Sequence, residues 1–505
     1  MRDFLVKRPM LLSAIFSSIA LLVGVNFEEL WLAICILAFA FLVLSFLGNK
    51  KSTIVFSFFM IVAVMFCAHF HILQAKQIDS YSNTVCSGEY IVIDGPYNHG
   101  DYYSATVETV KSEMLKKGSK ITVTYSVGNL NFAQNFKADI QLKSLNDSKY
   151  KYENYSESIY IKGSMYNVIS LDKYDFVLKS VGRLRDYIKN KILHNFEIRE
   201  AAIIMALLTG DKSYFTNEFY ENVKASGVAH VMVVSGMHLS VIVSLFLFVC
   251  DKFFYNRFLK AFIIFLTVLI VSAVCGFTMS IIRAGVTYIL IAVSLIINRQ
   301  NTPANTLGAA VTLIMFCNPF AIFSLSFQLS VLSTFGILVV AIPVTEYVSK
   351  RKIIKSKILL GLFSSVAISI SALLLTAPLT IYIFGYISNV SVITNLLISN
   401  VVTWAIILCI LGLCLPFLSK IFFVLSGFLV TYINFIINYF GSLPFAVTRL
   451  HQFVSCIAVL IVVIVFWVLL ACKKHNDMIK LKEIDNKRIK EGGKKIKWQS
   501  QMKKS

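Results

Sequence analysis

Long apolar stretches recur along this 505-residue chain and alternate with short polar segments. A helix needs about 20 mainly apolar residues to cross roughly 30 Å of hydrocarbon. Three stretches of about this length fill residues 1–73, and about ten more, some shorter, fill residues 227–472. The pattern predicts a polytopic α-helical membrane protein with about ten to thirteen crossings, a count that allows for re-entrant segments.

Proline and glycine mark the expected ends of helices in the second block. Pro319, Gly336, Pro378 and Gly385 are expected to interrupt helices, and Pro378 is expected to separate two spans. The expected spans of this block run over residues 230–250, 258–275, 279–297, 304–316, 323–344, 358–377, 379–397, 398–415, 422–439 and 453–472.

Residues 74–175 differ sharply from the apolar blocks, since polar residues, tyrosines and turn pairs dominate them. Short stretches that alternate β-branched or aromatic residues with polar ones predict a β domain. Five short strands and one long loop are typical of a small barrel of the oligonucleotide/oligosaccharide-binding (OB) type, and a sandwich fragment has a similar pattern. The expected strands run over residues 89–93, 102–110, 120–127, 137–142 and 159–170.

Two further segments complete the domain plan. Residues 176–226 are expected to form amphipathic or interfacial helices, with Thr216 capping one of them. Residues 473–505 form a lysine-rich tail of low hydrophobicity, which cannot support a packed core and is attracted to anionic lipid.

Composition agrees with a membrane location. Hydrophobic residues make up 57% of the chain and charged residues 15%, which excludes an ordinary soluble protein. The formal net charge of +21 does not by itself indicate nucleic acid, because cytoplasmic loops of membrane proteins are also basic. Arg2, Lys7 and Arg8 precede the first span, so we expect a cytoplasmic N-terminus and, with it, an extracytoplasmic β domain inserted after the third helix.

The sequence gives no sign of a cofactor or a metal centre. The ten cysteines form no CxxC pair and no zinc-like spacing. Cys86 is the only cysteine within residues 74–175, so that domain cannot close an internal disulfide.

The most unusual stretch is Gly227–Ser240, where two histidines, two serines and two glycines stand at the start of an apolar run. Imidazole is costly in hydrocarbon, so such a span usually faces protein, water or a ligand. A purely structural interpretation stays open, in which each histidine donates to a neighbouring backbone carbonyl and each glycine permits close packing.

This stretch resembles a signature of the ComEC competence proteins, written SHxxxxSGxH, over residues 229–238. Three further segments are similar to motifs of that family and follow in the family's order. They are Met279–Ala284 (MSIIRA), Asn318–Ser330 (NPF leading to FQLS), and Thr376–Leu379 (TAPL) followed by Asn389–Asn395.

The resemblance implies a polytopic competence domain that translocates single-stranded DNA into the cytoplasm during transformation, and an OB-like domain that contacts incoming DNA. Many family members continue into a metallo-β-lactamase-like domain with an HxHxDH metal cluster. No such cluster appears in this sequence, so the form lacking that domain is expected and no nuclease activity is carried over. Ala229 stands where the family commonly has serine.

A path for DNA needs donors that replace the hydration of phosphates. We therefore expect seven residues to line or shape it: His230, Ser235, Gly236, His238, Arg283, Gln328 and Asn395. In the β domain, aromatic and basic residues that could stack bases and follow phosphates are Tyr102, Tyr103, Lys120 and Tyr125.

Three other functions stay open. Ser235 and His238 are three residues apart and could contact each other as in a hydrolase, although no orienting acid lies nearby in the sequence. His230 and His238 lie about two helical turns apart, too far for one metal ion unless the helix breaks. A secondary transporter would also have broken helices, but the block shows no convincing internal repeat.

As a channel of the bacterial inner membrane, the protein is expected to act without a cofactor and without enzymatic activity of its own. Its expected partners are single-stranded DNA, membrane lipid, a DNA receptor, a cytoplasmic ATPase or helicase and a separate nuclease. Homo-oligomerisation stays open.

Overall fold

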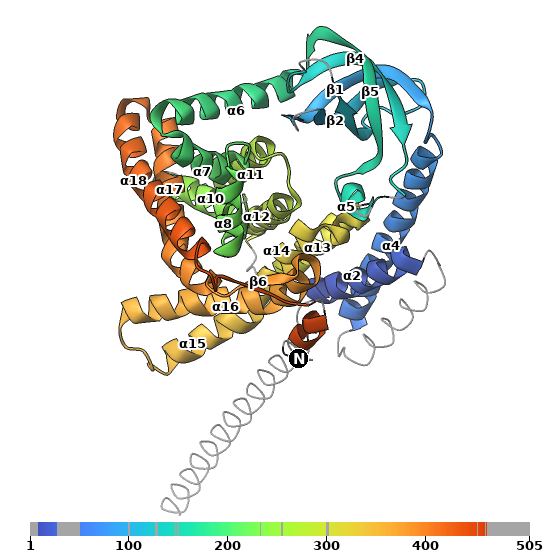
Figure 1. Ribbon diagram of the computed structural model, residues 1–505. Helices are drawn as coiled ribbons and strands as arrows, with labels where there is room; N and C mark the ends of the chain where they lie inside the picture. The colour runs from blue at the N-terminus through green and yellow to red at the C-terminus, as the bar shows by residue number, and fades with distance from the viewer. Residues whose placement is uncertain are drawn as a thin grey trace, which may run out of the picture.

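The computed structural model describes residues 9–27, 51–98, 102–126, 130–146, 148, 151–232, 234–253, 256–298, 302–451, 453–459 and 461. A β-barrel lies at one corner of a large helical assembly, next to α4 (Lys51–Asp79) (Figure 1). Helix α6 (Phe176–Asn195) runs from the barrel to the opposite side of the assembly, where α17 (Ser391–Cys414) and α18 (Ser419–Gly441) lie (Figure 1).

Seven helical stretches among the described residues are long and apolar enough to cross a membrane. Their outer faces carry large exposed apolar side chains, such as Phe66 (73% exposed) and Phe428 (71% exposed), which water would not stabilise. The chain is therefore a membrane protein. The seven stretches are Phe59–Asp79, Arg257–Val274, Met279–Ile297, Leu325–Lys350, Lys357–Phe384, Ser391–Cys414 and Pro416–Gly441.

The N-terminal part contains two described helices, α2 (Pro9–Phe27) and α4, which pack against each other. Helix α2 also packs against α13 (Pro303–Cys317), where Gly308 faces the backbone of Leu11 with no room for a side chain. The second expected span, over residues 30–47, lies outside the described residues.

The five expected strands are all present, and they form a closed barrel in the order β1-β2-β3-β5-β4. Pairing is antiparallel except between β3 and β5, which are parallel. Strands β1, β4 and β5 extend beyond the expected ranges, β2 is shifted towards the C-terminus, and β3 ends earlier than expected: β1 Val85–Asn98, β2 Tyr103–Ser112, β3 Lys120–Tyr125, β4 Gln134–Lys143 and β5 Ile159–Tyr174.

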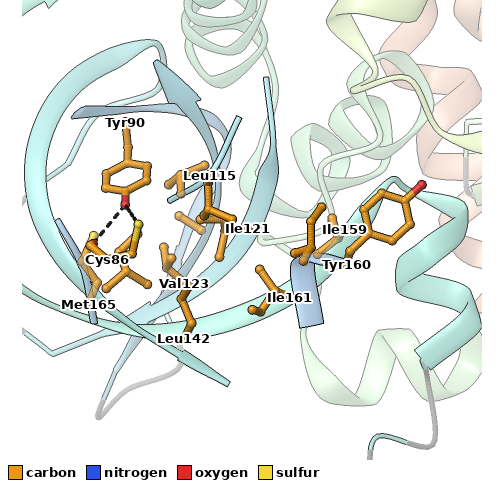
Figure 2. Packing of buried hydrophobic residues seen from close by; sticks show 14 of the residues in the cluster. Cys86, Tyr90, Leu115, Ile121, Val123, Leu142, Ile159, Tyr160, Ile161 and Met165 are labelled. Atoms are coloured by element: carbon orange, nitrogen blue, oxygen red, sulfur yellow. Dashed lines mark hydrogen bonds between the residues drawn. The ribbon is translucent and has the colours of Figure 1, made fainter. Parts of the chain in front are cut away.

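Alternating apolar residues of these strands fill the barrel. Tyr90 is fully buried there, and its hydroxyl donates to the Cys86 carbonyl (3.1 Å) (Figure 2). Burial raises the pKa of Tyr90, so the phenol stays neutral. The expected long loop over residues 146–158 contains a short helix, α5 (Lys151–Ser156).

Three helices connect the barrel to the central stretch: α6, α7 (Ile198–Thr209) and α8 (Asn217–Ala225). Thr216 caps α8 as expected, since its hydroxyl accepts a hydrogen bond from the Phe219 amide (3.2 Å). Helix α7 is buried from Ala201 to Leu208, so it packs inside the protein and not along an outer surface.

The expected break at Pro378 is wrong, because this proline lies inside one continuous helix, α16 (Lys357–Phe384). Proline inside a membrane helix is tolerated where neighbouring helices, hydroxyls or small backbone adjustments compensate for the lost backbone hydrogen bond. Gly385 ends the helix instead, with a φ of +71°.

The expected division at residue 397 is also wrong, since α17 runs unbroken from Ser391 to Cys414. Before it, strand β6 (Tyr386–Ser388) pairs with β7 (Val447–Arg449) in a small sheet that the sequence pattern did not predict. The remaining helices are α9 (Ala229–Met232), α10 (Gly236–Phe253), α11 (Arg257–Val274), α12 (Met279–Ile297), η1 (Pro319–Phe323), α14 (Leu325–Gly336), η2 (Ile337–Ala341), α15 (Ile342–Lys350) and η3 (Pro416–Leu418).

Candidate functional site

The histidine stretch forms two helices instead of the single span expected over residues 230–250. Helix α9 ends at Met232, and α10 begins at Gly236. Ser235 stands at the start of α10, where its hydroxyl accepts from the Met237 amide (3.3 Å) and its carbonyl accepts from the Leu239 amide (3.3 Å). A serine in this position satisfies first-turn amides, so it promotes the start of a new helix.

Ser235 and His238 contact each other at the start of α10. The Ser235 hydroxyl lies 3.0 Å from His238 Nδ1, and the Ser235 amide donates to the same nitrogen (3.1 Å). A backbone N–H can only donate, so Nδ1 is the acceptor and the neutral ring carries its proton on Nε2. His238 is fully buried, and this Nε2 has no partner among the described residues.

Arg283 approaches the same helix start from α12. A Cβ at Gly236 would lie 2.8 Å from Arg283 Nη2 and 3.1 Å from the Ala284 Cβ, so a side chain here would displace the end of the arginine. Arg283 is 9% exposed, and its Nε donates to the Ser330 hydroxyl of α14 (3.1 Å). The Ser280 hydroxyl also donates to Ser330 (3.3 Å).

The two polar groups lie on different sides of α10. Ser235 and His238 are three residues apart and share a helix face, whereas Gly236 and His238 are two apart and do not. The start of α10 therefore has imidazole on one side and guanidinium on the other.

Three of the family-like segments meet around α10 in this way. The serine-histidine stretch supplies α9 and α10, the second segment supplies Ser280 and Arg283, and the third supplies Ser330. Ser280 and Ser330 were not among the expected site residues, although both lie within segments that the sequence singled out.

The fourth segment contacts the turn before α9. Gly227 has a φ of +75°, and it leaves no room for a Cβ beside Ser391 of this segment and the preceding Ser388. Ser388 in turn donates to the Ala225 carbonyl (2.7 Å). Asn395, farther along in α17, has a buried Oδ1 with no partner among the described residues.

Gln328 and His230 differ in their surroundings. The Gln328 amide donates to the Ile322 carbonyl (2.7 Å), so it joins α14 to η1. The His230 side chain is exposed, although α9 lies between helices. Of the seven residues expected to line the path, His230 is therefore the most exposed.

The NPF segment joins the helices to the barrel. The Asn318 amide nitrogen donates to the Ser156 carbonyl (2.6 Å), and Asn318 Oδ1 accepts from the Phe320 amide (3.0 Å). Phe320 is 1% exposed and packs edge-on against Tyr155, at a centroid distance of 5.0 Å. This role was not foreseen from the sequence.

The four barrel residues expected to contact DNA are not equally accessible. Tyr102 is 45% exposed, and Tyr103 and Lys120 are half-buried. Tyr125 is 4% exposed and stacks on Tyr103 at a centroid distance of 5.6 Å. The expectation that Tyr125 offers its ring to a base is therefore wrong, because the alternation of β3 directs it into the barrel.

The chemistry of the cluster is that of hydrogen-bond donors. No group of three or more histidine, cysteine or acidic residues that could hold a metal ion occurs in the described part of the chain. His238 has no acid on Nε2 within the same part, so the Ser235–His238 pair lacks the third, orienting member of a hydrolase triad.

The comparison with protein families decides the identity. The family model "Competence protein" matches residues 207–475, which is more than half of the chain. The chain belongs to the competence protein family. The matched residues include α10 and most of the membrane helices, and the family has a role in DNA uptake during competence.

Two curated relatives are similar to this competence-family chain. ComE operon protein 3 of Bacillus subtilis is 22% identical over 280 residues, which cover 54% of this chain and 34% of that protein. An uncharacterized protein of Mycoplasma genitalium is 28% identical over 204 residues, or 40% of this chain and 49% of that protein. The chain therefore matches about half or less of each relative's length, and no solved structure matches it.

Proposed function

We propose that this protein forms a path through the cytoplasmic membrane for single-stranded DNA during natural competence. The path passes the start of α10, where His230, Ser235, Gly236, His238 and Arg283 gather. Asn395 and Gln328 shape its surroundings. The observation that carries the proposal is the convergence of three family-like segments on one helix start inside an apolar bundle.

The energetic cost of this cluster supports the proposal. A buried arginine and a buried histidine N–H without a partner each destabilise the folded protein. Such groups are retained in membrane proteins mainly where they serve a substrate. A polymer with one negative charge per nucleotide is the substrate that a set of donors suits best.

The barrel extends the proposal to the outer face of the membrane. Its closed five-stranded form suits an OB-like domain that contacts incoming DNA through exposed residues such as Tyr102 and Lys120. With the N-terminus in the cytoplasm, the barrel faces the extracytoplasmic side. DNA would then meet the barrel before the helical centre.

This assignment implies a set of partners. Single-stranded DNA and membrane lipid contact the chain directly, and a DNA receptor, a cytoplasmic ATPase or helicase and a separate nuclease act with it. The chain itself acts as a conduit without catalysing a reaction. A homo-oligomer is compatible with this function.

The experiment is a transformation assay in a strain whose own gene has been deleted. The wild-type chain is expected to restore DNA uptake, and Arg283→Ala and His238→Ala are expected to abolish most of it at normal expression. Phe428→Ala, on the exposed face of α18, is the control and should behave as wild type. Full uptake by both site variants would contradict the proposal.

A further inference from the structure

Arg283 has an unusual electrostatic position. It is 91% buried, and neither of its terminal nitrogens has a partner among the described residues, whereas its Nε is held by Ser330. None of the ion pairs in the described part of the chain includes Arg283. The guanidinium is always charged, so this part of the bundle holds a positive charge without a negative one.

The helix start beside it increases the imbalance. Arg283 Nη2 faces Gly236, the first residue of α10, where the helix dipole is positive. The Met237 amide is bonded to Ser235, whereas the Gly236 and His238 amides have no acceptor in the described residues. Unpaired amides at a helix start form an anion site, and the guanidinium beside them favours the same kind of ligand.

The form of the site indicates which anion it takes. Ser330 holds Nε, so both terminal nitrogens remain free to bond to two oxygens of one group, as guanidinium does with phosphate. The described part of the site contains one cation, Arg283, which matches the single negative charge of one phosphodiester. Conduction of a charged substrate requires sites that bind it and then release it.

We propose that Arg283 and the first turn of α10 form a discrete binding site for one phosphate group of the DNA backbone. This inference rests on the proposed function for its ligand, a phosphodiester of single-stranded DNA. Gly236 is the residue that specifies the site, because any side chain there would displace the guanidinium from the helix start.

The first arm of the test uses inorganic phosphate and the purified full-length protein in lipid nanodiscs. Phosphate is expected to raise the unfolding temperature of the wild type by about a few degrees relative to chloride at equal ionic strength. Arg283→Gln should abolish this shift. Arg257→Gln removes an exposed arginine at the start of α11 and is the matched control, which should keep the shift.

The second arm uses a labelled single-stranded oligonucleotide and measures its affinity by anisotropy over a range of salt concentrations. Loss of one phosphate contact reduces the slope of log K against log salt by about 0.7. Arg283→Gln should show this reduction, and Arg257→Gln should keep the wild-type slope. Ser330→Ala keeps the Arg283 charge but removes the hydrogen bond that orients its guanidinium. Its affinity for the oligonucleotide should therefore fall, while the salt slope stays at the wild-type value.

The outcomes separate the site from the proposed function. A phosphate shift that Arg283→Gln abolishes supports the site, and a reduced slope identifies DNA as its ligand. Wild-type protein that binds phosphate but no oligonucleotide would refute the proposed function and the DNA ligand while the anion site stands. Equal phosphate-induced shifts of the unfolding temperature in wild type and Arg283→Gln would overturn the site. If Arg283→Gln does not fold, an unchanged oligonucleotide affinity in Ser330→Ala would overturn it instead.

Discussion

Two arginines of this protein lie against helix ends, and their surroundings are opposite. Arg185 of α6 donates to the Val274 carbonyl (2.8 Å) and the Ala273 carbonyl (3.0 Å) at the end of α11, where the helix dipole is negative. Arg283 faces the start of α10, where the dipole is positive, and has one hydroxyl partner. The first arrangement stabilises the fold, whereas the second leaves the charge of Arg283 without a negative partner among the described residues.

The same contrast applies to what each arginine connects. The Arg185 guanidinium also lies over the Phe132 ring beside the barrel, 4.8 Å from its centroid, so it ties α6, α11 and the barrel together. Arg283 connects α12 to Ser330 and Gly236, inside the family-matched region. The residue type alone therefore does not distinguish the roles of these two arginines. The helix end that each one faces, a negative C-terminus or a positive N-terminus, does distinguish them.

The largest expected effect is on DNA uptake by Arg283→Met. Removing the charge should reduce transformation by about 100-fold, which corresponds to about 2.7 kcal/mol. The unfolding temperature should stay the same or rise, since an apolar side chain replaces an uncompensated buried charge. Transformation frequency measures the loss of uptake, and thermal unfolding of the purified protein measures the change in stability. A large loss of stability would show that Arg283 resembles Arg185 after all.

Arg185→Met should have the reverse effect. Loss of two charge-assisted hydrogen bonds is expected to lower the free energy of unfolding by about 1.5–3 kcal/mol. Uptake per folded molecule should remain at the wild-type level. The measurement is thermal unfolding together with transformation normalised to the amount of folded protein. A loss of normalised uptake as large as that of Arg283→Met would remove the distinction between the two arginines.

Gly236→Ala should reduce uptake by about tenfold without removing any charged group, since displacing the guanidinium weakens binding by about 1.4 kcal/mol. The matched control is Gly361→Ala in α16, where nothing lies within 4 Å of the added methyl group. Transformation assays of both variants at equal expression provide the comparison. Equal uptake by the two would mean that the close approach to Gly236 has no function.

The smallest expected effect is at the barrel surface. Hydrogen bonds from Ser87 and Asn167 hold the pKa of Asp139 below its usual value. A carboxylate with a lowered pKa stabilises the fold above its unfolded pKa, and this contribution is lost as the pH falls through the folded pKa. The acid side of the pH–stability curve should therefore be slightly flatter in Asp139→Asn than in wild type. Thermal unfolding between neutral and acidic pH measures this, and parallel curves would contradict it.

The sequence allowed the barrel to be predicted better than the ends of the helices. Alternation and turn residues located all five strands, because each strand has its own two-residue period. Pro378 does not break its helix as predicted, because the rule that proline ends a helix comes from soluble proteins and is weaker inside a membrane bundle. Apolar runs in lipid have no polar face that would mark where one span ends.

The candidate site was predictable only as a set of segments. The order of the motifs indicated that residues 229–238, 279–284 and 318–330 matter, but not that Gly236 meets Arg283 or that Ser330 orients it. These contacts join residues about 50 positions apart, and local periodicity carries no such information. Tyr125 was misassigned for a related reason, since only the barrel's closure determines which face of β3 is inside.

The most direct test of the DNA path is a cross-link between the helical centre and DNA in transit. A cysteine placed at Ala229, where the family commonly has serine, would react with thiol-reactive single-stranded DNA stalled during uptake in an otherwise cysteine-free protein. If DNA passes the helical centre, a DNA adduct forms at position 229 and none forms at Phe428→Cys on the exposed face of α18. Adducts at both positions to the same extent, or at neither while uptake proceeds, would contradict the DNA path.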